Sequence, residues 1–240
     1  MISRLPTWVW SGAASLAVVA GMVNVVGYLG FEHQAVTHLT GTTSLLGASI
    51  AQGESRASWH LLLMILAFVG GAALSGMLIQ DSTLRLGRRY GVALAIEAVL
   101  LAFSVPLFER QQIAGAALAA MACGLQNAMT ATYSGALVRT SHLTGMFTDL
   151  GVFLGHRLRG MAVDQRRLWL CTLIICGFLL GGVIGALLFP HYGYGTLYLP
   201  AALTGSSGIA YFGYRMWGGP AGTLSSCPTR LWPTWPFCPP

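Results

Sequence analysis

The strongest constraint on this chain is a series of long apolar stretches separated by short polar segments. Each stretch has about the 20 residues that an α-helix needs to cross a hydrocarbon core of about 30 Å. Only 8% of the 240 residues are charged, against about 25% in a typical soluble domain, so a soluble fold would lack the charge to cover its surface. The stretches are 8–29, 60–79, 90–107, 113–137, 168–189 and 196–217. The sequence therefore predicts an all-α, polytopic bundle of transmembrane helices.

Two short motifs occur once in each half of the chain. Gly-Met-Val-Asn at 21–24 returns as Gly-Leu-Gln-Asn at 124–127, and His-Leu-Thr-Gly at 38–41 returns at 142–145. Such self-similarity indicates a duplicated structural unit. A row of small residues four apart also has a counterpart in the second half: Ala67, Gly71 and Ser75 match Gly177, Gly181 and Gly185. Small residues in such a row let two membrane helices approach closely.

We therefore expect one membrane domain over 1–217, with repeat one at about 8–108 and repeat two at about 112–217. The remaining segment, 218–240, is rich in Pro, Ser and Trp. We expect it to be a disordered tail, because closely spaced prolines prevent a regular helix.

Two short segments, 38–52 and 142–155, are too short and too polar to cross a membrane alone. If they did cross, there would be eight spans, and the Arg-rich loop 81–89 would lie outside, against the enrichment of Arg in cytoplasmic loops. If they enter and return as re-entrant or half helices, six spans result and only Arg56 and Arg110 lie outside. The second topology predicts a cytoplasmic N-terminus in a bacterial inner membrane. Three spans per repeat then make the repeats inverted, as in many secondary transporters.

The repeated motifs, with Ala128 after the second Asn, resemble the YoaK-like membrane proteins, also called domain of unknown function 1275. The resemblance extends from about residue 10 to 217. It implies a polytopic bacterial membrane protein without an established activity. Asn24 stands where an Asp is common in that family, and Thr42 stands where an Asn commonly follows Thr-Gly. The resemblance therefore supplies no proton-carrying Asp at position 24.

The candidate substrate-binding residues lie where the two short helices would begin. They are His38, Thr40, Gly41, His142, Thr144 and Gly145, with Asn24 and Asn127 on the preceding spans. Free N–H groups at helix N-termini attract anions, Thr is a common N-cap, and His titrates near neutral pH. Alternatively, the threonines only cap the helices and the histidines lie at the headgroup boundary. The two Asn amides either line a site or brace the short segments, because a buried amide needs a partner.

Two carboxylates are candidate proton carriers. Glu97 lies near the middle of a predicted span, where an ionised group is costly and therefore suggests a function. The alternative is a neutral, hydrogen-bonded Glu97 at a packing interface. Asp149 is the second candidate, with an ion pair to Arg139 or Arg157 as its alternative role.

Enzyme signatures are weak. Gly-Ser-Ser-Gly at 205–208 fits a rhomboid-type protease motif, but no His follows it, and the chain has no His-Glu-x-x-His or Walker loop. We expect no enzyme activity, no metal or cofactor, and no nucleic acid partner, since the arginines lie between spans. The expected partners are the lipid bilayer and a small solute, and homo-oligomers are left open.

We expect a secondary transporter or facilitator of a small polar or anionic solute; the alternatives are a passive channel and a non-transporting scaffold or sensor.

Overall fold

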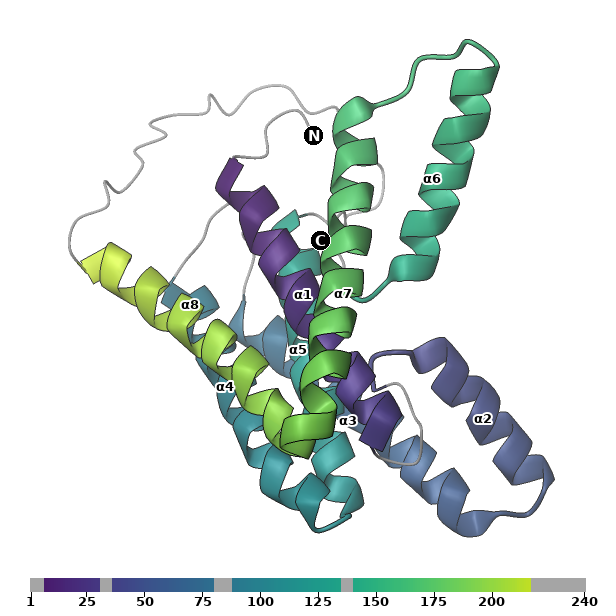
Figure 1. Ribbon diagram of the computed structural model, residues 1–240, viewed down its shortest axis with the longest axis vertical. Helices are drawn as coiled ribbons and strands as arrows, with labels where there is room; N and C mark the ends of the chain where they lie inside the picture. The colour runs from purple at the N-terminus through teal and green to yellow at the C-terminus, as the bar shows by residue number, and fades with distance from the viewer. Residues whose placement is uncertain (1–6, 31–35, 80–87, 135–139, 217–240) are drawn as a thin grey trace, which may run out of the picture.

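The structure is a computed structural model that describes residues 7–30, 36–79, 88–134 and 140–216. All regular secondary structure in these residues is helical (Figure 1). The elements are α1 (Thr7–Gly30), α2 (Leu39–Ala51), α3 (Ser55–Leu78), α4 (Arg88–Glu109), α5 (Ile113–Ser134), α6 (Leu143–Leu158), α7 (Gln165–Tyr192), the 3-10 helix η2 (Gly193–Leu197) and α8 (Tyr198–Met216).

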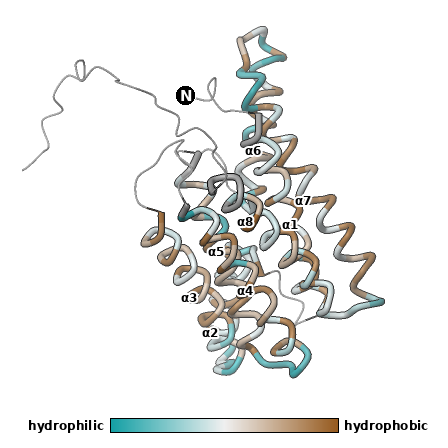
Figure 2. Tube along the Cα trace, turned by 90° about the vertical axis from the view of Figure 1, so that its left-hand side faces the viewer, coloured by the Kyte–Doolittle hydropathy of each residue, from teal (hydrophilic) through white to brown (hydrophobic). Residues whose placement is uncertain are grey.

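Much of the described chain is long enough and apolar enough to cross a membrane. Five helical segments meet both conditions: Trp10–Gly30, Ser55–Leu78, Arg89–Glu109, Ile113–Thr132 and Gln165–Tyr211. The last one contains α7, η2 and α8, and Figure 1 shows the chain reversing direction at η2. In Figure 2, apolar residues run along the middle of the bundle and hydrophilic residues gather at its two ends. A polytopic helical bundle is thus confirmed.

Two helices begin three or more residues earlier than their apolar stretches predicted. The helix α3 begins at Ser55 rather than at residue 60, and α7 begins at Gln165 rather than at residue 168. The carboxylate of Asp164 caps α7 by accepting the backbone N–H of Arg166 at 3.0 Å. Polar first turns add no hydropathy, so hydropathy alone does not reveal them. The end of the predicted fourth stretch and the tail 218–240 lie outside the described residues.

Glycines bring α1 against α7 so closely that the two backbones touch. A methyl group on Gly181 would overlap the carbonyl oxygen of Val18, and one on Gly21 would overlap that of Phe178. Contacts advance along both helices in the same direction: α7 residues 177, 181 and 185 face α1 residues 14, 18 and 22 in that order. The two helices are therefore parallel.

The same kind of contact joins α3 to α5. A methyl group on Gly71 would overlap the carbonyl oxygen of Met121, and one on Gly124 would overlap that of Phe68. Close backbone approach of this kind allows van der Waals packing where lipid provides no hydrophobic drive for association. The predicted packing role of Gly71 and Gly181 is therefore seen in both helix pairs.

The helix α4 packs against α5, to which the connection 110–112 joins it, and against α8. Gly91 of α4 faces Gly208 and Tyr211 of α8, whereas Ala98, further along α4, faces the earlier Gly205. The residue numbers run in opposite directions, so α4 and α8 are antiparallel. Buried apolar side chains of α4 and α5 form much of the core: Leu101, Val105, Phe108, Ala116, Ala119, Ala120 and Cys123.

The two short helices lie beside the bundle. The helix α2 packs on α3, and α6 packs on α7. Short connections, 52–54 and 159–164, join each short helix to its neighbour, so each pair forms an antiparallel hairpin. Figure 1 shows both short helices starting near mid-height of the bundle and extending toward opposite ends.

Candidate functional site at the starts of the short helices

Both short helices begin at the predicted His-Leu-Thr-Gly motifs. His38 and His142 occupy the N-cap positions, and Leu39 and Leu143 are the first helical residues. The two His side chains are exposed, as are those of Thr40 and Thr144. Each helix start therefore presents an imidazole and a hydroxyl on the outside of its hairpin.

The glycine of each motif makes room for the histidine ring. A methyl group on Gly41 would lie 2.5 Å from Cδ2 of His38, and one on Gly145 would lie 2.6 Å from Cδ2 of His142. Both rings therefore lie over the first turn of their own helix. Any larger residue at these positions would displace the imidazole.

The prediction that Thr40 and Thr144 are N-caps is wrong. Both lie inside the first turn, one residue beyond the first helical residue, and neither short helix has a side-chain cap. The neighbouring hydroxyls turn toward the preceding carbonyl oxygens instead: Thr42 donates to His38 and Thr148 donates to Thr144. The first helical residues are Leu39 and Leu143, so Thr40 and Thr144 lie one residue too far along the helix for their hydroxyls to cap its first N–H groups.

Asn24 braces the segment that leads into α2. Its side-chain oxygen accepts the backbone N–H of Thr37 at 3.1 Å and the hydroxyl of the same residue at 2.7 Å. Thr37 is buried and directly precedes His38. A half-buried amide of α1 therefore satisfies the irregular backbone from which α2 starts.

Asn127 makes the corresponding contacts before α6. Its side-chain oxygen accepts the backbone N–H of Ser141 at 3.2 Å, and its amide nitrogen donates to the hydroxyl of Ser141 at 2.6 Å. The same amide also donates to the carbonyl oxygen of Cys123 at 3.1 Å. Of the two expected roles of these Asn residues, the contacts favour bracing at both positions.

Sequence reasoning missed the partners of these amides. A hydroxyl-bearing residue directly precedes the His of each motif, Thr37 in the first and Ser141 in the second. This common feature was the available signal for the partners of the two amides. A further contact occurs only in the second half, where buried Gln126 donates to the carbonyl oxygen of Leu16 at 2.6 Å and to the hydroxyl of Thr140 at 3.2 Å. Gln126 thereby connects α5, α1 and the start of α6.

The two short helices do not contact each other, and each is fixed to its own neighbour by a different interaction. On the α2 side, the hydroxyls of Ser49 and Ser58 lie 2.9 Å apart. On the α6 side, Asp149 forms an ion pair with Arg167 of α7 at 2.9 Å. The expected partners of Asp149 were Arg139, which lies outside the described residues, and Arg157. Arg167 takes this place because the antiparallel hairpin sets the first turn of α7 beside α6.

Glu97 is buried at the centre of α4, with 1% of its surface exposed. Its Oε2 atom has no hydrogen-bond partner among the described residues. Cys123 of α5 lies within electrostatic range of its carboxyl group. Glu97 is separated from the starts of both short helices, because α4 contacts neither α2 nor α6.

Within the part of the chain that the structure describes, no three His, Cys, Asp or Glu side chains gather closely enough to hold a metal ion. The serines of the Gly-Ser-Ser-Gly run lie inside α8, where Ser206 and Ser207 donate to the carbonyl oxygen of Leu203 at 3.1 and 2.7 Å. What the described site offers is therefore hydrogen bonding, from two imidazoles, two threonine hydroxyls and two helix N-termini.

Comparisons with known proteins agree with the membrane architecture. The model of the family described as protein of unknown function (DUF1275) matches residues 12–210. The chain is also similar to the UPF0700 transmembrane protein YoaK of Bacillus subtilis (strain 168). The two are 25% identical over 196 residues, which cover 78% of this chain and 87% of the relative. No solved structure matches the chain significantly.

Proposed function

The chain belongs to the DUF1275 family of membrane proteins, and from its architecture we propose that it is a secondary transporter or facilitator of a small polar or anionic solute. The observation that carries this proposal is the pair of short helices whose starts are braced in the same way by Asn24 and Asn127. In transporters, discontinuous helices near the membrane midplane direct their N-termini at anionic groups of the substrate.

The packing directions support six crossings rather than eight. If α3, α4, α5, α7 and α8 all cross the membrane, the chain crosses three times after α4 to complete α8 when α6 does not cross, and four times when it does. Because α4 and α8 are antiparallel, this number must be odd, so α6 does not cross. Parallel α1 and α7 then require that α2 does not cross either. The short helices therefore enter the membrane and end on the side where the following helix begins.

The side of the membrane follows from the distribution of arginine. Arg89, at the start of α4, and the four arginines of the α6–α7 region belong to one end of the bundle, while Arg56 and Arg110 belong to the other. Because arginine is enriched in cytoplasmic loops, the first end and the N-terminus are proposed to face the cytoplasm of a bacterial inner membrane. Single-Cys labelling from outside in a Cys-free background should modify positions 54 and 193. Labelling at position 87 would contradict this topology.

The glycine contacts support an inverted repeat. Gly21 and Gly124 hold matching positions in the repeated motifs, and each approaches the carbonyl oxygen of a phenylalanine in the second long helix of the other half. Gly71 and Gly181 match in the same way. The first helix of each half thus packs on the partner half rather than on its own. This exchange of partners between the halves supports equivalent positions of opposite orientation for the two short helices.

A solute would be bound through the exposed groups at the helix starts. The backbone N–H groups of each first turn carry partial positive charge, which favours an anion or the negative end of a polar solute. The imidazoles of His38 and His142 add groups that can donate or accept a hydrogen bond. Thr40 and Thr144 add hydroxyls that can bond a solute in either direction.

Glu97 is the proposed proton carrier. Asp149 is less suited to this role because Arg167 holds it in an ion pair, whereas a buried carboxyl oxygen of Glu97 has no hydrogen-bond partner among the residues that the structure describes. Cys123 of α5 lies within electrostatic range of this carboxyl group. Intramembrane carboxylates of this kind form proton relays in pumps and transporters.

The proposal is tested with the purified full-length protein in proteoliposomes. Uptake of labelled acetate, phosphate and glycerol is measured with and without a pH gradient, and proton movement is followed with an enclosed pH dye. Saturable uptake of any of these solutes supports a transporter or facilitator. Flux without saturation or pH coupling would indicate a passive channel. No flux of any solute would favour a scaffold or sensor.

Variants locate the site. Thr40→Val and Thr144→Val are expected to abolish saturable uptake while leaving insertion and folding intact, because each removes one exposed hydroxyl and keeps the side-chain shape. Thr132→Val is the matched control, since the Thr132 hydroxyl donates to the carbonyl oxygen of Ala128 in its own helix. Equal uptake by all three variants would exclude the helix starts as the binding site.

A further inference from the structure

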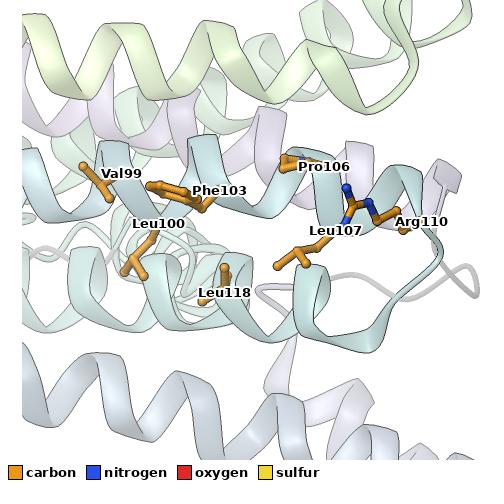
Figure 3. A pocket seen from close by; sticks show the side chains of 7 residues that line it. All are labelled: Val99, Leu100, Phe103, Pro106, Leu107, Arg110 and Leu118. Carbon is orange, nitrogen blue, oxygen red and sulfur yellow. The ribbon is translucent and has the colours of Figure 1, made fainter.

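An open groove of about 410 Å³ lies on the surface formed by α4 and α5 (Figure 3). We call it the α4–α5 groove. It is lined by Val99, Leu100, Phe103, Pro106, Leu107, Arg110 and Leu118. Six of these residues are apolar and one is cationic, so the groove joins a long apolar wall to a single positive charge.

The positive charge lies at one end of the groove. Arg110 directly follows α4, and Figure 3 shows its side chain reaching back along the helix toward Pro106 and Leu107. The Arg110 side chain is exposed and forms no ion pair with any residue that the structure describes. Glu109 is exposed too, but it does not line the groove. The guanidinium is therefore free to bind an anion.

The length of the groove corresponds to one leaflet of a membrane. From Val99 to Arg110 the helix rises about 16 Å at 1.5 Å per residue, which is about half of a hydrocarbon core about 30 Å thick. The wall is accessible from the side, since Val99 is 53% and Phe103 64% exposed. An acyl chain lying along this wall would bring its headgroup to the level of Arg110.

At the Arg110 end of the groove, α4 is fixed by contacts of the buried Phe108, which does not line the groove. The ring of Phe108 stacks on that of Tyr194 at a centroid distance of 4.9 Å, and the ring of Phe189 meets Tyr194 edge-on. The side-chain amide of Gln111 donates to the carbonyl oxygen of Phe108 at 3.3 Å. These contacts fix the α4–α5 connection against η2, so the position of Arg110 relative to the apolar wall is defined.

We propose that the α4–α5 groove binds an anionic phospholipid, with one acyl chain along Val99 and Phe103 and the headgroup phosphate on Arg110. Guanidinium groups bind phosphate through charge-assisted hydrogen bonds, and the apolar wall provides the contact that a free phosphate ion could not use. This inference does not rest on the proposed transport function, because the groove lies away from the starts of α2 and α6.

The test compares two lipids that differ only in headgroup. The full-length protein is purified, and its binding of dioleoyl phosphatidylglycerol and dioleoyl phosphatidylcholine is measured by native mass spectrometry. We expect the anionic lipid to bind about fivefold more tightly, the effect of one basic residue near an anionic lipid surface. Equal binding of the two lipids would overturn the proposal. Equally tight binding of free oleate would also overturn it, since the site would then accept any anionic amphiphile.

Three variants separate the charge from the wall. Arg110→Gln should remove the preference for the anionic lipid, whereas Arg56→Gln, which removes an exposed charge at the same end of the bundle, should keep it. Val99→Trp fills the groove without changing charge and should weaken binding of both lipids. Retention of the preference in Arg110→Gln would overturn the proposal, as would unchanged binding of both lipids in Val99→Trp. Gel filtration of each variant shows that it is folded.

Discussion

Replacing Asn127 by alanine tests whether the braced backbone before α6 stabilises the protein. The wild-type amide makes three hydrogen bonds of 3.2 Å or shorter, one to Cys123 and two to Ser141. Side-chain hydrogen bonds in membrane proteins average about 0.6 kcal/mol. Losing all three should therefore lower the free energy of unfolding by about 2 kcal/mol. Asn24→Ala loses two bonds, both to Thr37, and should lower it by about 1 kcal/mol on the same scale.

Thermal unfolding in detergent micelles or bicelles measures the overall effect, and hydrogen exchange by mass spectrometry locates it. In Asn127→Ala, exchange should increase in the peptide over 140–150 and remain unchanged in α3. Thr132→Val is a suitable control because it removes only a hydroxyl that donates within its own helix. If Asn127→Ala unfolds like the wild type and its 140–150 peptide exchanges no faster, the amide does not brace α6.

Three further results are expected from variants elsewhere in the bundle. Gly181→Ala should destabilise the protein by about 1–3 kcal/mol through overpacking. In thermal unfolding, Gly182→Ala should be neutral or stabilising, because its added methyl group meets open space. Equal effects of the two variants would contradict the close contact between Gly181 and Val18. Asp149→Asn should lower the free energy of unfolding by less than about 1 kcal/mol, because the ion pair with Arg167 is partly exposed. Hydrogen exchange should rise in α6 alone, and a rise in α2 as well would contradict a local role of this ion pair. Glu97→Gln should leave folding intact and make solute uptake independent of the pH gradient; uptake in the variant that still follows the gradient would exclude Glu97 as the proton carrier.

The long helices and the starts of the two short helices could be predicted from the sequence because their signals are local. Apolar length marks a membrane helix, and His38 and His142 mark the beginning of a short polar one. The need of a buried amide for a partner also led to bracing as one role of Asn24 and Asn127. These predictions depend on residues close together in the chain.

The parts that could not be predicted depend on contacts between distant segments. A row of small residues shows that Gly71 and Gly181 face another backbone, but it does not say which helix provides that backbone. The partner of Asp149 was missed for a similar reason, since Arg167 comes close only when α6 and α7 form a hairpin. The capping role assigned to Thr40 depended on a helix boundary, and boundaries shift by a residue or two with the local backbone.

The pairing of α1 with α7 has a consequence for how the chain assembles during synthesis. The helix α1 enters the membrane first, but the surface around its Gly21 finds its partner only when α7 arrives, more than a hundred residues later. By contrast, α3 meets α5 after only one intervening long helix. Because domains form as the chain emerges, α3, α4 and α5 can associate before α7 has been synthesised, while α1 still lacks its packing partner. A chain that ends before α7 would keep this early unit and leave the first helix without the neighbour that its glycines fit.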